Sequence, residues 1–126
     1  MPTNVFLSFA MEDKPLVEVF RSLAKNRTTN LNFKVYSVKE PFDRAWKTRV
    51  ESIIRYCSVT ICLVGSTTHR SGAVDWEIRK SIELGKKLLA VYLIESPVIL
   101  PKALAEWGIE PYQRGSFVRN LGQIAS

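Results

Sequence analysis

Residues 4–10 read NVFLSFA, a nearly continuous apolar run that is rich in residues favouring β-strands. Such a run is typical of a strand buried on both faces of a parallel sheet. Two later segments have the same character, SVTICLV at 58–64 and KLLAVYLI at 87–94. A less hydrophobic segment at 31–37 and a short one near 109–112 are the remaining candidates. The sequence therefore predicts four or five strands.

Segments with helical periodicity lie between the predicted strands. Asp13 followed by Pro15 is typical of a helix start. Further helices are expected over 44–56 and 73–84, the latter ending at Gly85. Single helices between strands indicate right-handed crossovers and a parallel sheet. The expected fold is α/β and flavodoxin-like, with three layers: a sheet of strand order 2-1-3-4-5 and helices on both of its faces.

The length of 126 residues is that of one ordinary domain, so we expect a single domain over 1–126. Hydrophobic residues make up 46% and charged residues 24%, which excludes disordered and low-complexity classes. No apolar run approaches the ~20 residues of a membrane helix. The opening MPTNVFLSFA lacks the pattern of a signal peptide. These features predict a cytoplasmic protein that does not contact a membrane.

Potential metal ligands are few. Cys57, Cys62 and His69 fall short of a structural zinc set, so we expect no metal. The cysteines are interpreted as small buried hydrophobic residues in a reducing compartment.

The net charge is +6, with a sequence pI of about 9.6, and a basic surface attracts anions. The basic residues are nevertheless spread along the chain, without an arm, zinc finger or RNA-binding signature. Solvated helix faces are therefore favoured over nucleic-acid binding as their explanation.

Glu77 is the most informative residue. At 100° per residue along the helix predicted over 73–84, Glu77 falls inside the arc of apolar side chains. Burying a carboxylate is costly unless it is paired or lines a cavity. A capping box is excluded, because position 74 is Val rather than Ser or Thr. Two interpretations stay open: a buried salt bridge to an arginine, or a functional carboxylate facing the crevice beyond the strand ends.

Two other signals each have a structural and a functional interpretation. Trp46 begins the apolar stripe of the helix over 44–56, where it either packs in the core or stacks on a flat ring at the crevice. Hydroxyl residues of the segment 66–71 either cradle a phosphate or serve as caps and turns. Neither a Walker motif nor a GxGxxG pattern accompanies that segment.

Two segments carry a family resemblance. VFLSFAMEDK at 5–14 resembles the first strand and loop of Toll/interleukin-1 receptor (TIR) domains, which often read FxSxAxEDK. VGSTTHRSGAVDWEIRKSIELGKK at 64–87 resembles the third strand, loop and helix of TIR-like proteins of the bacterial Thoeris anti-phage system (ThsB type). The matching positions are Phe6, Ser8, Ala10, Glu12, Asp13, Lys14, Val74, Trp76, Glu77, Ile78 and Ser81. One position departs: Ala73 stands where the family often has Trp, four residues before the glutamate.

The resemblance implies an enzyme that cleaves NAD at the nicotinamide–ribose bond and makes an ADP-ribose-derived, in some members cyclic, immune signal. Glu77 would be the catalytic residue. Ser8, Phe9 and Ala10 would border the nucleotide, and Trp46 would be a stacking wall. NAD would be the substrate, with no further cofactor. One carboxylate suffices for an oxocarbenium-like transition state, and the neutral nicotinamide leaves without a general acid.

The resemblance also implies partners. TIR-like enzymes commonly complete the site with a neighbouring subunit through the loop after the second strand, here Val38–Arg44, so we expect a homo-oligomer. A downstream effector would be reached through a diffusible nucleotide signal. The main alternative is a non-catalytic TIR-like scaffold that signals by self-association, which Ala73 favours. A receiver-like domain is disfavoured, because position 66 is Ser where a phospho-accepting Asp is needed.

Overall fold

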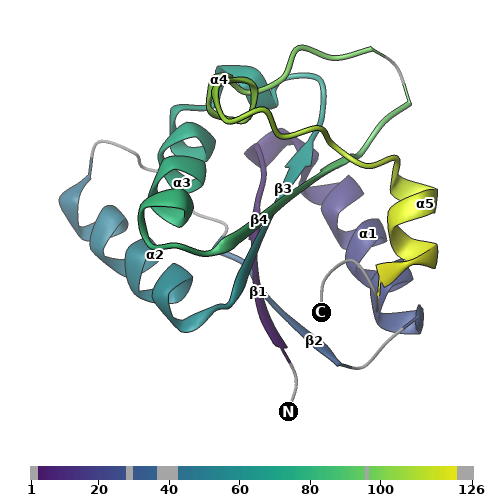
Figure 1. The fold of residues 1–126 in the computed structure, drawn as a ribbon, viewed down its shortest axis with the longest axis horizontal. Helices are drawn as coiled ribbons and strands as arrows, with labels where there is room; N and C mark the ends of the chain where they lie inside the picture. Colours follow the sequence, from purple (N-terminus) through teal and green to yellow (C-terminus); the bar gives the residue numbers. More distant parts are fainter. Residues whose placement is uncertain (1–2, 28–29, 37–42, 96, 122–126) are drawn as a thin grey trace.

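A parallel sheet of four strands forms the centre of the computed structural model, which describes residues 3–27, 30–36, 43–95 and 97–121. The strands are β1 (Thr3–Ser8), β2 (Leu31–Lys34), β3 (Val59–Val64) and β4 (Lys87–Tyr92). Their order in the sheet is β2-β1-β3-β4, and all three neighbouring pairs run parallel. This confirms the parallel α/β fold and the order expected for the first four strands (Figure 1).

The expected fifth strand is reduced to one bridge within the described part of the chain. Tyr112 pairs in parallel with Val91, and its N–H donates to the Ala90 carbonyl at 2.8 Å. Pro111 has no N–H to extend this pairing, and helix α5 begins at Arg114. The bridge still lies beside β4, which is the place expected for a fifth strand.

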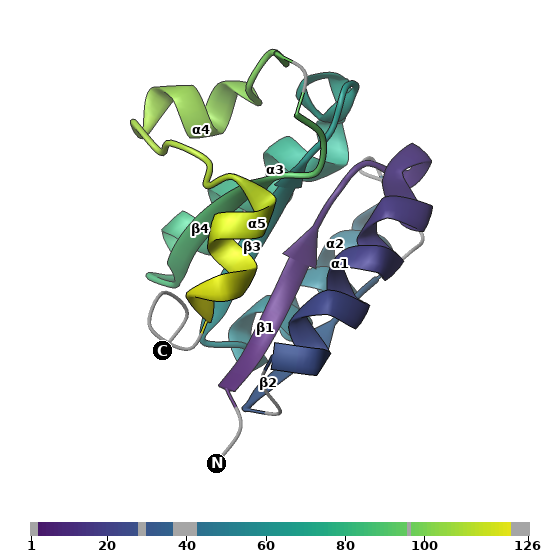
Figure 2. The same ribbon diagram turned by 90° about the vertical axis from the view of Figure 1, so that its right-hand side faces the viewer.

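Helices cover both faces of the sheet. Their bounds are α1 (Lys14–Arg27), α2 (Arg44–Tyr56), α3 (Gly72–Glu83), α4 (Lys102–Glu106) and α5 (Arg114–Arg119). Two 3-10 turns precede α1 and α3, namely η1 (Met11–Asp13) and η2 (Thr68–Arg70). Helices α1 and α5 lie on one face, and α2 and α3 lie on the other (Figures 1 and 2). None of the helices in the described ranges has the length and apolarity to cross a bilayer.

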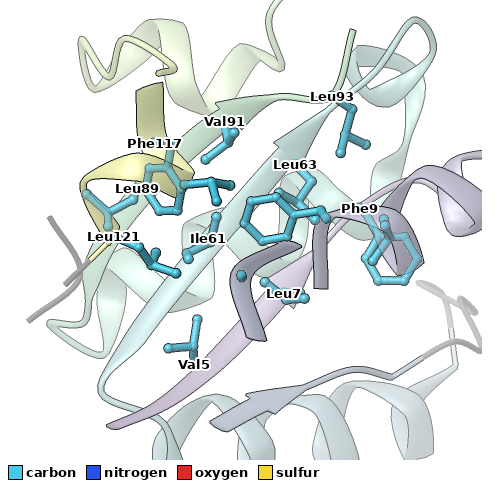
Figure 3. Close-up of a cluster of buried hydrophobic side chains, with 14 of the residues drawn as sticks. Val5, Leu7, Phe9, Ile61, Leu63, Leu89, Val91, Leu93, Phe117 and Leu121 are labelled. Carbon is cyan, nitrogen blue, oxygen red and sulfur yellow. The ribbon is translucent and has the colours of Figure 1, made fainter. Parts of the chain in front are cut away.

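Side-chain alternation along β1 divides the core. Val5, Leu7 and Phe9 join the apolar cluster that lies against α1 and α5 (Figure 3). Phe6 points to the other face and packs in the cluster that contains residues of α2. Ser8 follows Phe6 at a spacing of two and therefore also faces α2 and α3. The last residue of β1 is thus a polar group directed at the helix that carries Glu77.

Several element ends differ from the expected ones. β1 stops at Ser8 rather than at residue 10, because the Ala10 carbonyl accepts from the N–H of Asp13 (2.9 Å) and closes turn η1. α1 begins at Lys14, directly after Asp13, which confirms the expected helix start, and the Asp13 side chain is buried. Ser37, expected to end the second strand, lies outside the described residues.

Both cysteines are buried and neither forms a disulfide, as the sequence predicted. Burial raises the pKa of the Cys57 thiol to about 11, which leaves it protonated and unreactive near neutral pH.

Candidate functional site at the carboxyl edge of the sheet

Helix α3 begins at the carboxyl edge of the sheet and brings Glu77 into the interior. The Ser71 hydroxyl oxygen accepts from the N–H of Val74 (3.1 Å), which caps the helix. The buried face of α3 consists of Ala73, Val74, Glu77, Ile78 and Ser81. The predicted position of Glu77 within the apolar arc is therefore confirmed.

Glu77 meets the end of β1. The Ser8 hydroxyl donates to Glu77 Oε1 at 2.6 Å, and both side chains are 0% exposed. Ser8 pairs with Cys62 in the centre of the sheet, so the contact lies where β1 and β3 end side by side. A short hydrogen bond to a carboxylate is stronger than one between neutral groups. The structure thus joins two of the predicted site residues directly.

Two more buried hydroxyls hold the helical turn of Glu77. The Ser81 hydroxyl donates to the Glu77 carbonyl oxygen at 2.8 Å and lies 2.8 Å from the Thr60 hydroxyl. A serine has one hydroxyl proton, so Thr60 must be the donor to Ser81. This chain fixes α3 to β3, while Ser8 fixes it to β1.

Phe9 and Ala10 are placed differently from Ser8. Phe9 lies with Leu7 and Leu63 on the α1 and α5 side of the sheet (Figure 3), whereas the Ser8 hydroxyl faces Glu77 of α3. Ala10 is buried next to the turn that leads into α1. Their role beside a nucleotide stays a prediction.

Trp46 lies in the core between α2 and α3. It is 2% exposed, and its ring centroid lies 5.3 Å from that of Trp76. The same cluster contains Ala73 and Phe6. An indole from α2 therefore occupies space beside Ala73, the position where the family often has Trp. Stacking of Trp46 on a substrate stays a prediction, and it would require this cluster to open.

A shallow groove of about 290 Å³ lies at the start of α3. Its lining residues are Met11, Glu12, Thr67, Arg70, Ser71, Gly72 and Ala73. The Thr67 hydroxyl donates to the Glu12 carboxylate at 2.7 Å, and this bond lowers the pKa of Glu12. The sequence offered Thr67 only within the hydroxyl segment 66–71 and Glu12 only as a position that matches the family, although both follow strands that end at the same edge of a parallel sheet. That shared edge is the signal that could have found them.

Two further predictions concern the loop after the second strand and the absence of a metal. Of the loop Val38–Arg44, residues 38–42 lie outside the described residues, and Asp43 caps α2 by accepting from the N–H of Ala45 (2.8 Å). Within the described ranges, no three His, Cys, Asp or Glu side chains gather as a metal site requires.

Comparison with solved structures defines the class of fold. The TIR domain of the Toll-related receptor TRR-2 from Hydra magnipapillata is similar, with a TM-score of 0.68, 17% identity and 94% coverage of each chain. The structure described as the RPS4 and RRS1 TIR domain heterodimer is similar with a TM-score of 0.65 and 12% identity, covering 98% of this chain and 97% of that one. The fold is that of a TIR domain.

The model of the family described as "Thoeris protein ThsB, TIR-like domain" matches residues 6–97. The chain therefore belongs to the ThsB TIR-like family. No curated protein matches the sequence.

Proposed function

We propose that this TIR-like domain cleaves NAD at the nicotinamide–ribose bond, with Glu77 as the catalytic carboxylate. The observation that carries the proposal is the burial of Glu77 at the carboxyl edge of the sheet, against Ser8. Edges of this kind are where open parallel sheets bind nucleotides. A buried carboxylate is costly, and a functional role accounts for its presence at a position that α3 otherwise fills with apolar or small side chains.

The chemistry requires little beyond this carboxylate. As the bond between nicotinamide and C1′ of the ribose breaks, positive charge develops on the sugar ring. A fixed carboxylate in a site of low dielectric stabilises that charge. Nicotinamide departs as a neutral ring with the bonding electron pair, so no general acid is needed. Ser8 would hold the carboxylate oxygen in place during this step.

Contact with a substrate requires a change at α3. Glu77 is 0% exposed, so the sugar reaches it only after the side chains that cover the carboxylate at the junction of β1 and α3 move aside while the Ser8 contact holds. The groove lined by Glu12 and Ala73 lies at this junction and is the proposed entry. The protein would then be nearly silent until a trigger opens the site.

Membership in the ThsB family places this TIR domain in anti-phage defence. The product is an ADP-ribose-derived molecule, either linear or cyclic, that diffuses to a separate effector. NAD acts as substrate, and no resident cofactor takes part. The basic net charge of +6 favours approach of an anionic dinucleotide.

The test is incubation of the purified protein with NAD, with nicotinamide followed by chromatography. It is run at high protein concentration and again with lysate from phage-infected cells, to supply a trigger. Nicotinamide above a no-protein control supports the proposal, whereas its absence under both conditions contradicts it.

A non-catalytic scaffold is the second candidate function. Ala73 in place of the usual Trp is the feature that favours it. A scaffold would self-associate, as measured by sedimentation, without releasing nicotinamide.

A further inference from the structure

Two consecutive acids on the loop after β1 meet two consecutive threonines on the loop after β3. Glu12 accepts from the Thr67 hydroxyl at 2.7 Å, and Asp13 accepts from the Thr68 hydroxyl at 3.5 Å. We name these four residues the acid–threonine clasp. The outer pair borders the groove, and the inner pair is buried.

The inner pair is built around a glycine. The Thr68 hydroxyl oxygen accepts from the N–H of Gly65 at 2.7 Å while its proton points to Asp13. A Cβ added at Gly65 would overlap the Asp13 carboxylate, so only glycine leaves room for this side chain. Asp13 itself is 8% exposed, which is unusual for an acid that forms no ion pair in the described contacts.

The clasp stands directly before the helix of the candidate site. Thr68 begins turn η2, which leads without a break to the Ser71 cap and then to α3. Ser8, at the end of β1, donates a hydrogen bond to Glu77 within the same helix. The loop after β1 is thereby tied to η2, and the end of β1 is tied to the second turn of α3.

We propose that Asp13, Gly65 and Thr68 are positioning residues, which set the place of α3 and hence the distance of Glu77 from Ser8. The inference rests on the proposed function where it concerns turnover. These residues touch neither the ribose nor the leaving group. They act through turn η2, which leads directly into α3 at the Ser71 cap.

Thr68→Val tests the proposal, because valine keeps the shape of threonine and removes both hydrogen bonds. Thr48→Val is the matched control, since Thr48 is an exposed residue of α2 whose hydroxyl donates to the Arg44 carbonyl. Thr68→Ser restores the hydroxyl. Each protein is measured by amide hydrogen exchange and by nicotinamide release over a range of NAD concentrations.

We expect Thr68→Val to speed exchange at the Gly65 amide and across the first two turns of α3, and to lower kcat about tenfold with KM nearly unchanged. Thr68→Ser should recover both quantities, and Thr48→Val should change neither. Faster exchange at Gly65 alone, or unchanged kcat, would overturn the inference. A wild-type protein that releases no nicotinamide refutes the proposed function instead, and exchange across α3 still decides whether the clasp places the helix.

A second pair of variants tests the clasp without relying on Thr68. Gly65→Ala alone should lower the melting temperature, because its methyl group overlaps the Asp13 carboxylate. Combining it with Asp13→Ala removes the overlap, so the double variant should melt at a higher temperature than Gly65→Ala. Simple additivity of the two changes would contradict the contact on which the inference depends.

Discussion

The hydroxyl of Ser8 donates a 2.6 Å hydrogen bond to Oε1 of Glu77, a residue 69 positions later in the chain. This single contact joins the two segments on which the family resemblance rests, the first strand and the third helix. It also gives a buried carboxylate a neutral donor from the central strand pair of the sheet. The contact is therefore both a part of the core and the centre of the candidate site.

Replacing Ser8 with Ala should lower both the stability of the fold and the rate of nicotinamide release. Loss of a hydrogen bond to a buried charged group costs about 1.5–3 kcal/mol of unfolding free energy. Nicotinamide release should fall as well, because the carboxylate is no longer held against β1. Urea unfolding and turnover on the same preparation measure the two effects. Ser52→Ala is the control, since Ser52 is exposed on α2 and its hydroxyl donates only to the Thr48 carbonyl in the described contacts. Equal stability of the two variants would argue against the Ser8 contact.

Trp46 and Ala73 should be coupled, because they share one cluster. Ala73→Trp alone should destabilise the protein by about 1–3 kcal/mol, since the added indole overfills the core. Trp46→Ala alone should cost about 3–5 kcal/mol through the cavity that it leaves. The double variant should be more stable than the sum of these changes predicts, as measured by denaturant unfolding. A strictly additive double variant would show that the two positions do not compete for the same space.

Asp13 should make the unfolding free energy of the protein depend on pH. Its pKa is raised above the ordinary value of 3.8, first by burial and then by the charge of Glu12. The folded chain therefore holds this proton more tightly than the unfolded chain, so protonation stabilises the fold. The unfolding free energy of the wild type relative to Asp13→Asn should be highest below pH 3.8 and decline as the pH rises through the folded pKa. Urea unfolding at a series of pH values checks the slope, and a difference that rises with pH would contradict it.

Activity should increase faster than linearly with protein concentration. A small domain with a groove open at one edge has few walls to enclose a dinucleotide, and a neighbouring copy would supply the missing ones. Turnover across a dilution series, together with sedimentation, provides the measurement. Constant specific activity of a monomer over that series would count against a shared site.

The fold was predictable because its signals are local. The apolar runs of β1, β3 and β4 and the helices between them require a parallel sheet, and Gly85, with φ +71°, ends α3 as a glycine in that position commonly does. The extent of the fifth strand was less predictable from the sequence, because pairing at Tyr112 depends on how a proline-rich segment packs against the edge of β4. Asp13 was interpreted as the start of a helix, and α1 begins directly after it, but no local pattern predicts the burial of its side chain.

The candidate site was predictable only in part. Helical periodicity alone placed Glu77 on the buried face of α3. Its hydrogen bond to Ser8 depends on the register of β1 against β3 and on the packing of α3, which no local pattern specifies. Strand alternation predicts that Ser8 and Phe9 face opposite sides, and the structure places them so. The clasp went unnoticed because its two halves lie 55 positions apart.

The central claim is that Glu77 is the catalytic carboxylate, and nicotinamide release by Glu77→Gln compared with the wild type tests it most directly. Glutamine keeps the size of the side chain and an oxygen that accepts from Ser8, but removes the charge. If the carboxylate stabilises a cationic transition state, release should fall about a hundredfold or more, as for the loss of one preorganised electrostatic group.

Thermal melting of the same sample completes this measurement. If Glu77 is catalytic, the Glu77→Gln protein should be folded but inactive. It should melt at or above the wild-type temperature, since a desolvated charge has been removed. If Glu77 were half of a structural ion pair, the variant would instead lose about 3–5 kcal/mol of unfolding free energy. A Glu77→Gln protein that still releases nicotinamide at the wild-type rate, or one that is inactive because it is unfolded, would contradict the catalytic assignment.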